Sequence, residues 1–136
     1  MTTSDNKNEV KPITTIVIDD DYDTVDVFCE YLELQNVCVL GKGYNGKDAV
    51  ELYQKFRPDI VFLDSMMPDY DGCYALEKIM QIDRKSKVVM VTADMTAETE
   101  QKLTELNATS IVYKPFDIDR IMEVIGKLVE GEKLLC

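Results

Sequence analysis

The feature that most limits how this chain can fold is a regular alternation of short β-branched runs with longer segments whose apolar residues have helical spacing. The runs expected as strands cover residues 14–18, 37–40, 60–63, 87–91 and 110–113. Five repeats of strand and helix predict an α/β fold with a parallel sheet covered by helices on both faces. The expected helices carry apolar stripes at Val25, Phe28, Cys29 and Leu32; at Ala49, Leu52, Tyr53 and Phe56; at Leu76, Ile79 and Met80; at Ala97, Leu103 and Leu106; and at Ile118, Ile121, Met122, Ile125, Leu128 and Val129.

Turn and capping residues mark the expected ends of these elements. Gly41 and Gly43 are expected in the turn after the second strand, and Asn45 is expected to cap the helix that follows. Pro58 ends that helix, because proline cannot continue the helical hydrogen-bond pattern. Asp117 is expected to cap the last helix. The helix over residues 96–106 has a sparse stripe, so it is expected to be loosely held and mostly exposed.

The chain of 136 residues has the length of one domain. We expect a disordered lead-in over residues 1–12, one domain over 13–130 and a short tail over 131–136. The N-terminus has no apolar signal segment, and no apolar run approaches the roughly 20 residues that a membrane helix needs. These features predict a cytoplasmic protein that does not contact membranes.

The charge balance and the missing residue types exclude several functions. With 15 basic and 26 acidic residues the net charge is -11, which disfavours direct binding to nucleic acid. The chain has no histidine and no Cys-x-x-Cys spacing. The usual zinc sites, histidine general bases and histidine phosphocarriers are therefore excluded, and the cysteines are expected to be reduced.

Polar residues follow four of the expected strands and should meet at one edge of the sheet. Parallel strands end at the same edge, where open α/β sheets bind ligands. Two carboxylates about 4 Å apart repel by roughly 4 kcal/mol at an effective dielectric of 20, so the acidic residues here need a cation or a raised pKa. Each residue alone also fits an ordinary turn, cap or surface position. The residues are Asp19, Asp20, Asp21, Asp64, Thr92 and Lys114.

Four motifs in this order resemble a response-regulator receiver domain of two-component signal transduction, similar to the stand-alone chemotaxis type. The resemblance covers residues 14–128 and implies a flavodoxin-like, doubly wound, five-stranded parallel sheet of order 2-1-3-4-5 with five helices. The motifs are Ile16-Val17-Ile18-Asp19-Asp20-Asp21, the segment 58–72 with its core Leu63-Asp64-Ser65-Met66-Met67-Pro68, Val91-Thr92-Ala93, and Lys114-Pro115-Phe116.

This resemblance implies that Asp64 accepts a phosphoryl group from a sensor histidine kinase or phosphotransfer protein. It also implies a Mg²⁺ site formed by Asp19, Asp20, Asp64 and the backbone carbonyl of Met66, with Mn²⁺ as an alternative ion. Asp21 would be a third acid or a modulator.

The resemblance further assigns Thr92 and Lys114 to the phosphoryl oxygens and implies a cis bond before Pro115. Such a protein is a phosphoacceptor that takes part in its own phosphorylation and autodephosphorylation, and it is not classed as an enzyme. No output domain follows, so the signal is expected to pass through the surface to an unknown downstream protein. The expected state is a monomer or weak homodimer.

The chain departs from the family at its switch position. The family has an aromatic residue three positions before the lysine, where this chain has Ile111. Tyr113 lies two residues later on the same strand face, so either Tyr113 or the helix over residues 96–106 is a candidate for the readout. Met66 and Asp94 resemble positions that modulate the lifetime of the aspartyl phosphate.

Three other interpretations are open at this stage. Asp19-Asp20-Asp21 contains the Asp-x-Asp pattern of haloacid-dehalogenase-type phosphatases, although no later acidic metal motif follows. A flavodoxin would have to place a phosphate against these three aspartates, which would repel it. A receiver-shaped module that has lost phosphorylation would bind partners only.

Overall fold

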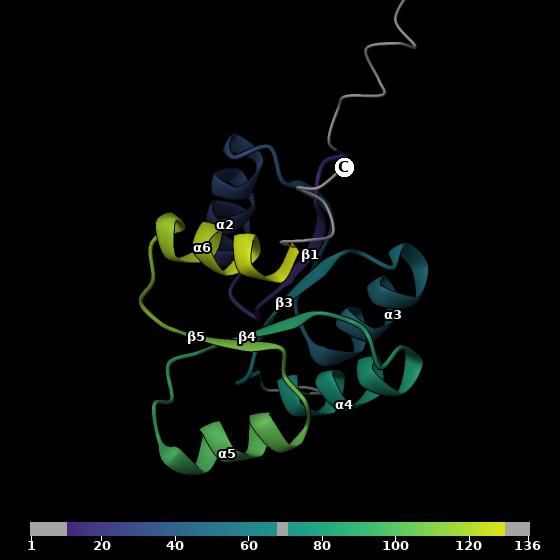
Figure 1. Cartoon of the computed structure of the whole chain (residues 1–136), viewed down its shortest axis with the longest axis vertical. Helices are drawn as coiled ribbons and strands as arrows, with labels where there is room; N and C mark the ends of the chain where they lie inside the picture. The colour runs from purple at the N-terminus through teal and green to yellow at the C-terminus, as the bar shows by residue number, and fades with distance from the viewer. Residues whose placement is uncertain (1–10, 68–70, 130–136) are drawn as a thin grey trace, which may run out of the picture.

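A computed structural model describes residues 11–67 and 71–129, and in this part of the chain five strands alternate with five helices (Figure 1). The elements agree closely with the periodicity of the sequence. In chain order they are β1 (Thr14–Ile18), α2 (Tyr22–Leu34), β2 (Cys38–Gly43), α3 (Gly46–Phe56), β3 (Ile60–Asp64), α4 (Gly72–Ile82), β4 (Val88–Thr92), α5 (Ala97–Glu105), β5 (Ser110–Tyr113) and α6 (Ile118–Val129).

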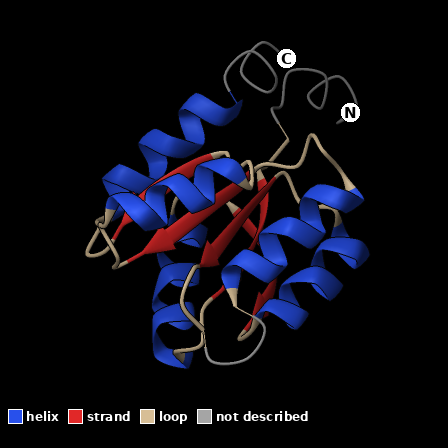
Figure 2. Ribbon diagram, turned by 90° about the horizontal axis from the view of Figure 1, so that it is seen from below, coloured by secondary structure: helices blue, strands red, loops and turns tan. Residues whose placement is uncertain are grey.

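All five strands are parallel and form one sheet in the order β2-β1-β3-β4-β5, which confirms the predicted topology. Helices α2 and α6 cover one face of the sheet, and α3, α4 and α5 cover the other (Figures 1 and 2). Two apolar cores result, one on each side of the sheet. β3 lies between β1 and β4 in the centre, and every residue of it is buried.

The second strand differs from the prediction. It runs from Cys38 to Gly43, so Gly41 and Gly43 lie in the strand and not in the turn after it. A Cβ on Gly41 would lie 2.9 Å from the side chain of Leu52, and one on Gly43 would lie 2.7 Å from that of Ile18. The glycines therefore allow α3 to pack closely against the sheet.

The predicted caps are present at two helices. The side chain of Asn45 accepts a hydrogen bond of 2.8 Å from the N–H of Asp48 at the start of α3. Asp117 accepts one of 2.9 Å from the N–H of Arg120 at the start of α6. The end of α3 is made by Arg57, which has a left-handed backbone (φ 46°), directly before the proline expected to end the helix.

Helix α5 is the least anchored of the described helices. Leu103 is its only buried residue, Ala97 is exposed although it was expected in the apolar stripe, and Leu106 is half-buried just after the helix. By contrast, α6 buries four residues, including Val124, which the predicted stripe omitted. The expectation of a loosely held helix over residues 96–106 is therefore supported.

The expected lead-in and tail lie mostly outside the described residues, which omit 1–10 and 130–136. Lys11 and Pro12 are exposed and belong to no regular element. Within the described ranges, no helix has the length and apolar character needed to cross a membrane.

Candidate functional site

The carboxyl ends of β1, β3 and β5 bring three carboxylates and one ammonium group together. Asp19 follows β1, Asp64 ends β3 and Lys114 follows β5. The carboxylates of Asp19, Asp20 and Asp64 each offer an oxygen within 4.8 Å of the others. Nζ of Lys114 lies 2.9 Å from Oδ2 of Asp19 and 3.7 Å from Oδ1 of Asp64. The predicted convergence at this edge is therefore present.

The acidic cluster is buried at its base and open at one side. Asp64 is 5% exposed and Asp19 is 6% exposed, whereas Asp20 is exposed. Two buried carboxylates and a third at the rim share one lysine, so negative charge is only partly compensated. Such a site favours a cation with oxygen ligands or an uncharged carboxyl group.

This imbalance shifts the pKa values of the cluster. Burial, followed by the nearby charge of Asp19, raises the pKa of Asp64 to about 6, against the opposing effect of Lys114. Slight burial and the hydrogen bond and charge of Asp19 raise the pKa of Asp20. Burial alone would lower the pKa of Lys114, but its hydrogen bond to Asp19 and the nearby carboxylates outweigh that effect and raise it.

The backbone around Asp64 fixes its carboxylate. Oδ1 of Asp64 accepts a hydrogen bond of 3.3 Å from the N–H of Met66, and the N–H of Gly72 donates to the carbonyl of Ser65 at 3.3 Å. A Cβ on Gly72 would overlap the backbone of Asp64 and Ser65, so only glycine fits there. Residues 68–70 of this predicted loop lie outside the described part of the chain.

The donor set fits a hard divalent cation such as Mg²⁺, which prefers carboxylate oxygens and retained waters. Asp19, Asp20 and Asp64 are the carboxylates that the structure groups for this purpose. Asp21 lies at the edge of the group: its N–H donates to Oδ1 of Asp19 at 3.0 Å, and its carboxylate accepts from the hydroxyl of Thr24 at 2.6 Å. Asp21 thus supports Asp19. The role of the Met66 carbonyl stays a prediction.

Thr92, the predicted phosphoryl ligand, is completely buried at the end of β4. Its Oγ1 accepts a hydrogen bond of 3.0 Å from the N–H of Asp94. The carboxylate of Asp94 in turn accepts from the N–H of Thr96 at 2.9 Å and from the hydroxyl of Thr99 at 2.6 Å. The bonds from Thr99 and Thr96 lower the pKa of Asp94. This connection to α5 was not apparent from the sequence.

The two candidate switch residues have different surroundings. Ile111 is half-buried and packs against the apolar core on the α3, α4 and α5 side. The hydroxyl of Tyr113 lies 3.2 Å from Oε2 of Glu100 in α5 and donates a hydrogen bond to it. Tyr113 therefore contacts the helix that was proposed as the alternative readout.

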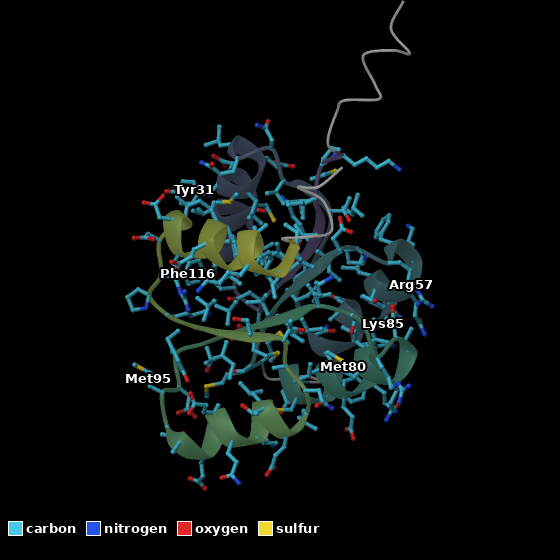
Figure 3. All side chains as sticks on the ribbon, in the orientation of Figure 1. Tyr31, Arg57, Met80, Lys85, Met95 and Phe116 are labelled. Carbon is cyan, nitrogen blue, oxygen red and sulfur yellow. The ribbon has the colours of Figure 1, made fainter. Side chains whose placement is uncertain are left out.

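A surface groove that sequence reasoning missed lies between α2 and the start of α6. Its volume is about 780 Å³, and Val27, Phe28, Tyr31, Phe116 and Ile118 form its apolar lining. Val27 and Tyr31 are about half exposed, and Figure 3 shows Tyr31 and Phe116 on the side where α2 and α6 meet. Because α2 and α6 are far apart in sequence, periodicity alone could not reveal this groove.

Comparison with known proteins identifies similarity over most of the chain. Residues 15–126 match the model of the response regulator receiver domain. The chain is 35% identical over 100 residues to protein CcdB of Bacillus subtilis strain 168, a match that covers 74% of this chain and 83% of that protein. It is 36% identical over 89 residues to the chemotaxis protein CheY of the same organism, covering 65% of this chain and 74% of CheY.

A solved structure shows the same fold. The crystal structure of the CheX-CheY-BeF3-Mg+2 complex from Borrelia burgdorferi contains a chain that superposes with a TM-score of 0.82 at 24% sequence identity. The superposition covers 86% of this chain and 89% of the other.

Proposed function

Because the chain belongs to the response-regulator receiver family, whose members act in phosphorylation-dependent signalling, we propose that it is a switch in which Asp64 accepts a phosphoryl group from a histidine-phosphorylated protein. The single observation that carries this proposal is the nearly buried Asp64 at the end of β3, with Lys114 and two more carboxylates beside it. A lysine and clustered carboxylates around one carboxylate suit a reaction in which phosphoryl charge must be neutralised.

In the transfer step, a carboxylate oxygen of Asp64 attacks the phosphorus of the donor's phosphohistidine. The bond between phosphorus and the imidazole nitrogen breaks, and the electron pair stays on that nitrogen. Oδ1 of Asp64 is oriented by Met66 and faces Lys114, which leaves the other oxygen for the attack. Lys114 then shares its charge with a phosphoryl oxygen, and Thr92 donates its hydroxyl proton to another.

Asp19, Asp20 and Asp64 would hold the divalent ion, with the carbonyl of Met66 as a further ligand. When bound, Mg²⁺ neutralises negative charge on the transferring group and on the carboxylates. Burial of Asp19 and Asp64 fixes two of these ligands before the ion arrives. Exposure of Asp20 leaves the outer side of the cluster open to the donor.

We place the phosphodonor over the groove between α2 and α6. The groove combines apolar residues with Asp23 and Asp117 at its rim, and α2 carries Asp23, Asp26, Glu30 and Glu33 without any lysine or arginine. A sensor kinase or phosphotransfer protein that presents an apolar helix flanked by basic residues would match this surface.

We place the output to a downstream protein on α5, β5 and α6. In this proposal the protein is a phosphoacceptor and not an enzyme with an external substrate, because the phosphoryl group it receives becomes attached to its own Asp64.

Phosphorylation of Asp64 adds nearly two negative charges, and it acts at a distance by biasing an element with two arrangements. We assign this role to α5, because Leu103 is its only buried residue.

The proposal is tested by incubating the protein with acetyl phosphate, with and without Mg²⁺, and weighing the intact chain. We expect a Mg²⁺-dependent gain of one phosphoryl group that is lost in Asp64→Asn. Asp48→Asn is a matched control, since it also removes one carboxylate but lies in α3, where Asp48 accepts a hydrogen bond from the N–H of Tyr44. Absence of any mass gain in a folded protein would contradict the proposal, and catalytic turnover of the phosphodonor without a stoichiometric adduct would favour a phosphatase.

A further inference from the structure

Two tyrosine rings stack at the edge of the sheet that carries the acidic cluster. Tyr22 is the first residue of α2, and Tyr44 directly follows β2. Their ring centroids lie 4.0 Å apart, with an angle of 25° between the ring planes. Tyr44 is half-buried and packs against the core on the α2 and α6 side. Tyr22 is 63% exposed, so burial in the core does not account for where its ring lies.

The stack is one of two anchors that lie on either side of Asp20 in the chain. On one side, the N–H of Asp19 donates a hydrogen bond of 3.1 Å to the carbonyl of Gly43 at the end of β2. On the other side, the ring of Tyr22 lies against that of Tyr44, the residue after Gly43. The segment between Asp19 and Tyr22 is therefore held at both ends by the end of β2. Because few backbone angles separate Asp20 from these anchors, they restrict where its carboxylate can lie.

Two other side-chain contacts at this end of α2 are weaker. The N-cap residue Asp21 makes no side-chain hydrogen bond to the backbone N–H groups of the first turn. An ion pair of 3.0 Å between Lys42 and Asp26 also joins β2 to α2, but these side chains are 44% and 59% exposed. Exposed ion pairs contribute little to stability, whereas an aromatic pair contributes beyond the area that it buries. The tyrosine stack is therefore the strongest of these side-chain links.

Asp20 needs a restraint because its charge opposes the arrangement that a cation requires. Asp19, Asp20 and Asp64 each offer a carboxylate oxygen within 4.8 Å of the others, and like charges at such distances repel. Asp19 and Asp64 are buried, whereas Asp20 is exposed. Before an ion binds, repulsion therefore favours displacement of the Asp20 segment toward solvent. Such a displacement lowers the fraction of the protein that is ready to bind an ion.

We propose that Tyr22 and Tyr44 are positioning residues whose stacked rings hold Asp20 beside Asp19 and Asp64 for a divalent cation. The inference rests on the cation site of the proposed function. The rings supply no ligand to the ion and act only through the backbone between Asp20 and Tyr22. Loss of the stack releases that backbone. Binding of the ion then has to order it, so the affinity for the ion falls.

The affinity of the folded protein for Mg²⁺ tests this proposal. We would titrate the chain with Mg²⁺ and follow its backbone amides by nuclear magnetic resonance, since the same spectra show that each variant is folded. We expect Tyr22→Ala and Tyr44→Ala each to weaken Mg²⁺ binding about fivefold. The double variant should bind within about twofold of either single variant, because each single change already removes the contact. Alanine has a higher helix propensity than tyrosine, so a loss in Tyr22→Ala does not arise from a weakened α2.

Three further variants separate the stack from other effects. Tyr22→Phe keeps an aromatic ring and should keep the wild-type affinity for Mg²⁺. Lys42→Met removes the exposed ion pair to Asp26 and should change the affinity by less than about twofold. Leu34→Ala is the matched control, since it removes an exposed apolar side chain from the other end of α2, and we expect no change.

Phosphorylation by acetyl phosphate gives a second readout. In Tyr22→Ala the concentration of Mg²⁺ at half-maximal rate should rise about fivefold, while the rate at saturating Mg²⁺ should change by less than about twofold. This split is expected if the rings act through the ion site alone. A lower rate that saturating Mg²⁺ does not restore would contradict the proposed role.

The outcomes distinguish this inference from the proposed function. Wild-type affinity for Mg²⁺ in Tyr22→Ala or Tyr44→Ala would overturn the inference and leave the phosphorylation of Asp64 unaffected. Losses that multiply in the double variant would also overturn it, because they would not come from one shared contact. A wild-type chain whose amides at positions 19, 20 and 64 do not respond to Mg²⁺ would overturn the proposed cation site, and the inference with it.

Discussion

Replacement of Asp64 by asparagine is expected to stabilise the protein against unfolding at neutral pH. The pKa of Asp64 is raised from 3.8 to about 6, first by burial and then by the charge of Asp19. One pKa unit corresponds to about 1.4 kcal/mol, so the ionised carboxylate destabilises the folded state by about 3 kcal/mol above pH 7. Asparagine leaves Lys114 without its partner at 3.7 Å, so we expect a net gain of about 2 kcal/mol.

The pH dependence gives this prediction its sign. The folded protein binds the Asp64 proton more tightly than the unfolded chain does, so stability is lost as the pH rises from about 4 to about 6 and is then constant. At pH 5 the cost is roughly half of its final value. The gap between wild type and Asp64→Asn should therefore grow from about 0.5 kcal/mol at pH 5 to about 2 kcal/mol at pH 7.5.

The assay is urea unfolding at both pH values in the presence of a chelator, and again with Mg²⁺. The ion should stabilise the wild type more than Asp64→Asn and narrow the gap, since it binds the folded carboxylates. Asp48→Asn changes the net charge equally and should show no such gain. A variant that is no more stable than wild type at pH 7.5, or a stability difference that does not grow with pH, would refute the assignment of burial and Asp19 as the cause of the raised pKa of Asp64.

Three further predictions follow from other contacts. Lys114→Met should lower the free energy of unfolding at pH 7.5 by about 1.5–3 kcal/mol, because the bond to Asp19 is lost; unchanged urea midpoints would contradict this. Leu103→Ala should lower the free energy of local unfolding of α5 by about 2–5 kcal/mol, which should be visible as faster amide exchange confined to α5. Uniform acceleration of exchange across all helices would argue that α5 is not separately anchored. Val27→Asp should slow phosphotransfer from a histidine-phosphorylated partner about tenfold while acetyl phosphate still reacts, whereas Leu34→Asp, outside the groove, should change neither rate.

Much of the fold and the centre of the site could be predicted from the sequence for a simple reason. Buried parallel strands give continuous β-branched runs, and these runs locate the ends of β1, β3, β4 and β5 within one residue, while β2 extends three residues beyond its predicted end. All parallel strands end at one edge, so Asp64 and Lys114 could be placed together without any knowledge of contacts between them. The structure bears out that placement with a separation of 3.7 Å between their charged atoms.

The features that the sequence did not reveal depend on which of several available packing or hydrogen-bonding partners a residue contacts in the folded protein. Gly41 and Gly43 fit a turn as well as a strand, and only the approach of Leu52 in α3 decides between them. The segment from Thr92 to Thr96 can form several local hydrogen bonds, and the sequence does not show that Asp94 contacts both ends. The groove between α2 and α6 depends on how these helices pack, which no local pattern encodes.

The weak anchoring of α5 also affects how the sequence of the protein can change during evolution. Substitutions at exposed positions away from special contacts usually change stability by no more than about 0.5 kcal/mol, and most of α5 is exposed. Glu98, Gln101 and Lys102 on this helix can therefore be replaced with little cost to the core that holds Asp64. A gene duplicate could acquire a new partner by substitutions on α5 and keep its chemistry, so descent with altered specificity requires few compensating changes elsewhere in the chain.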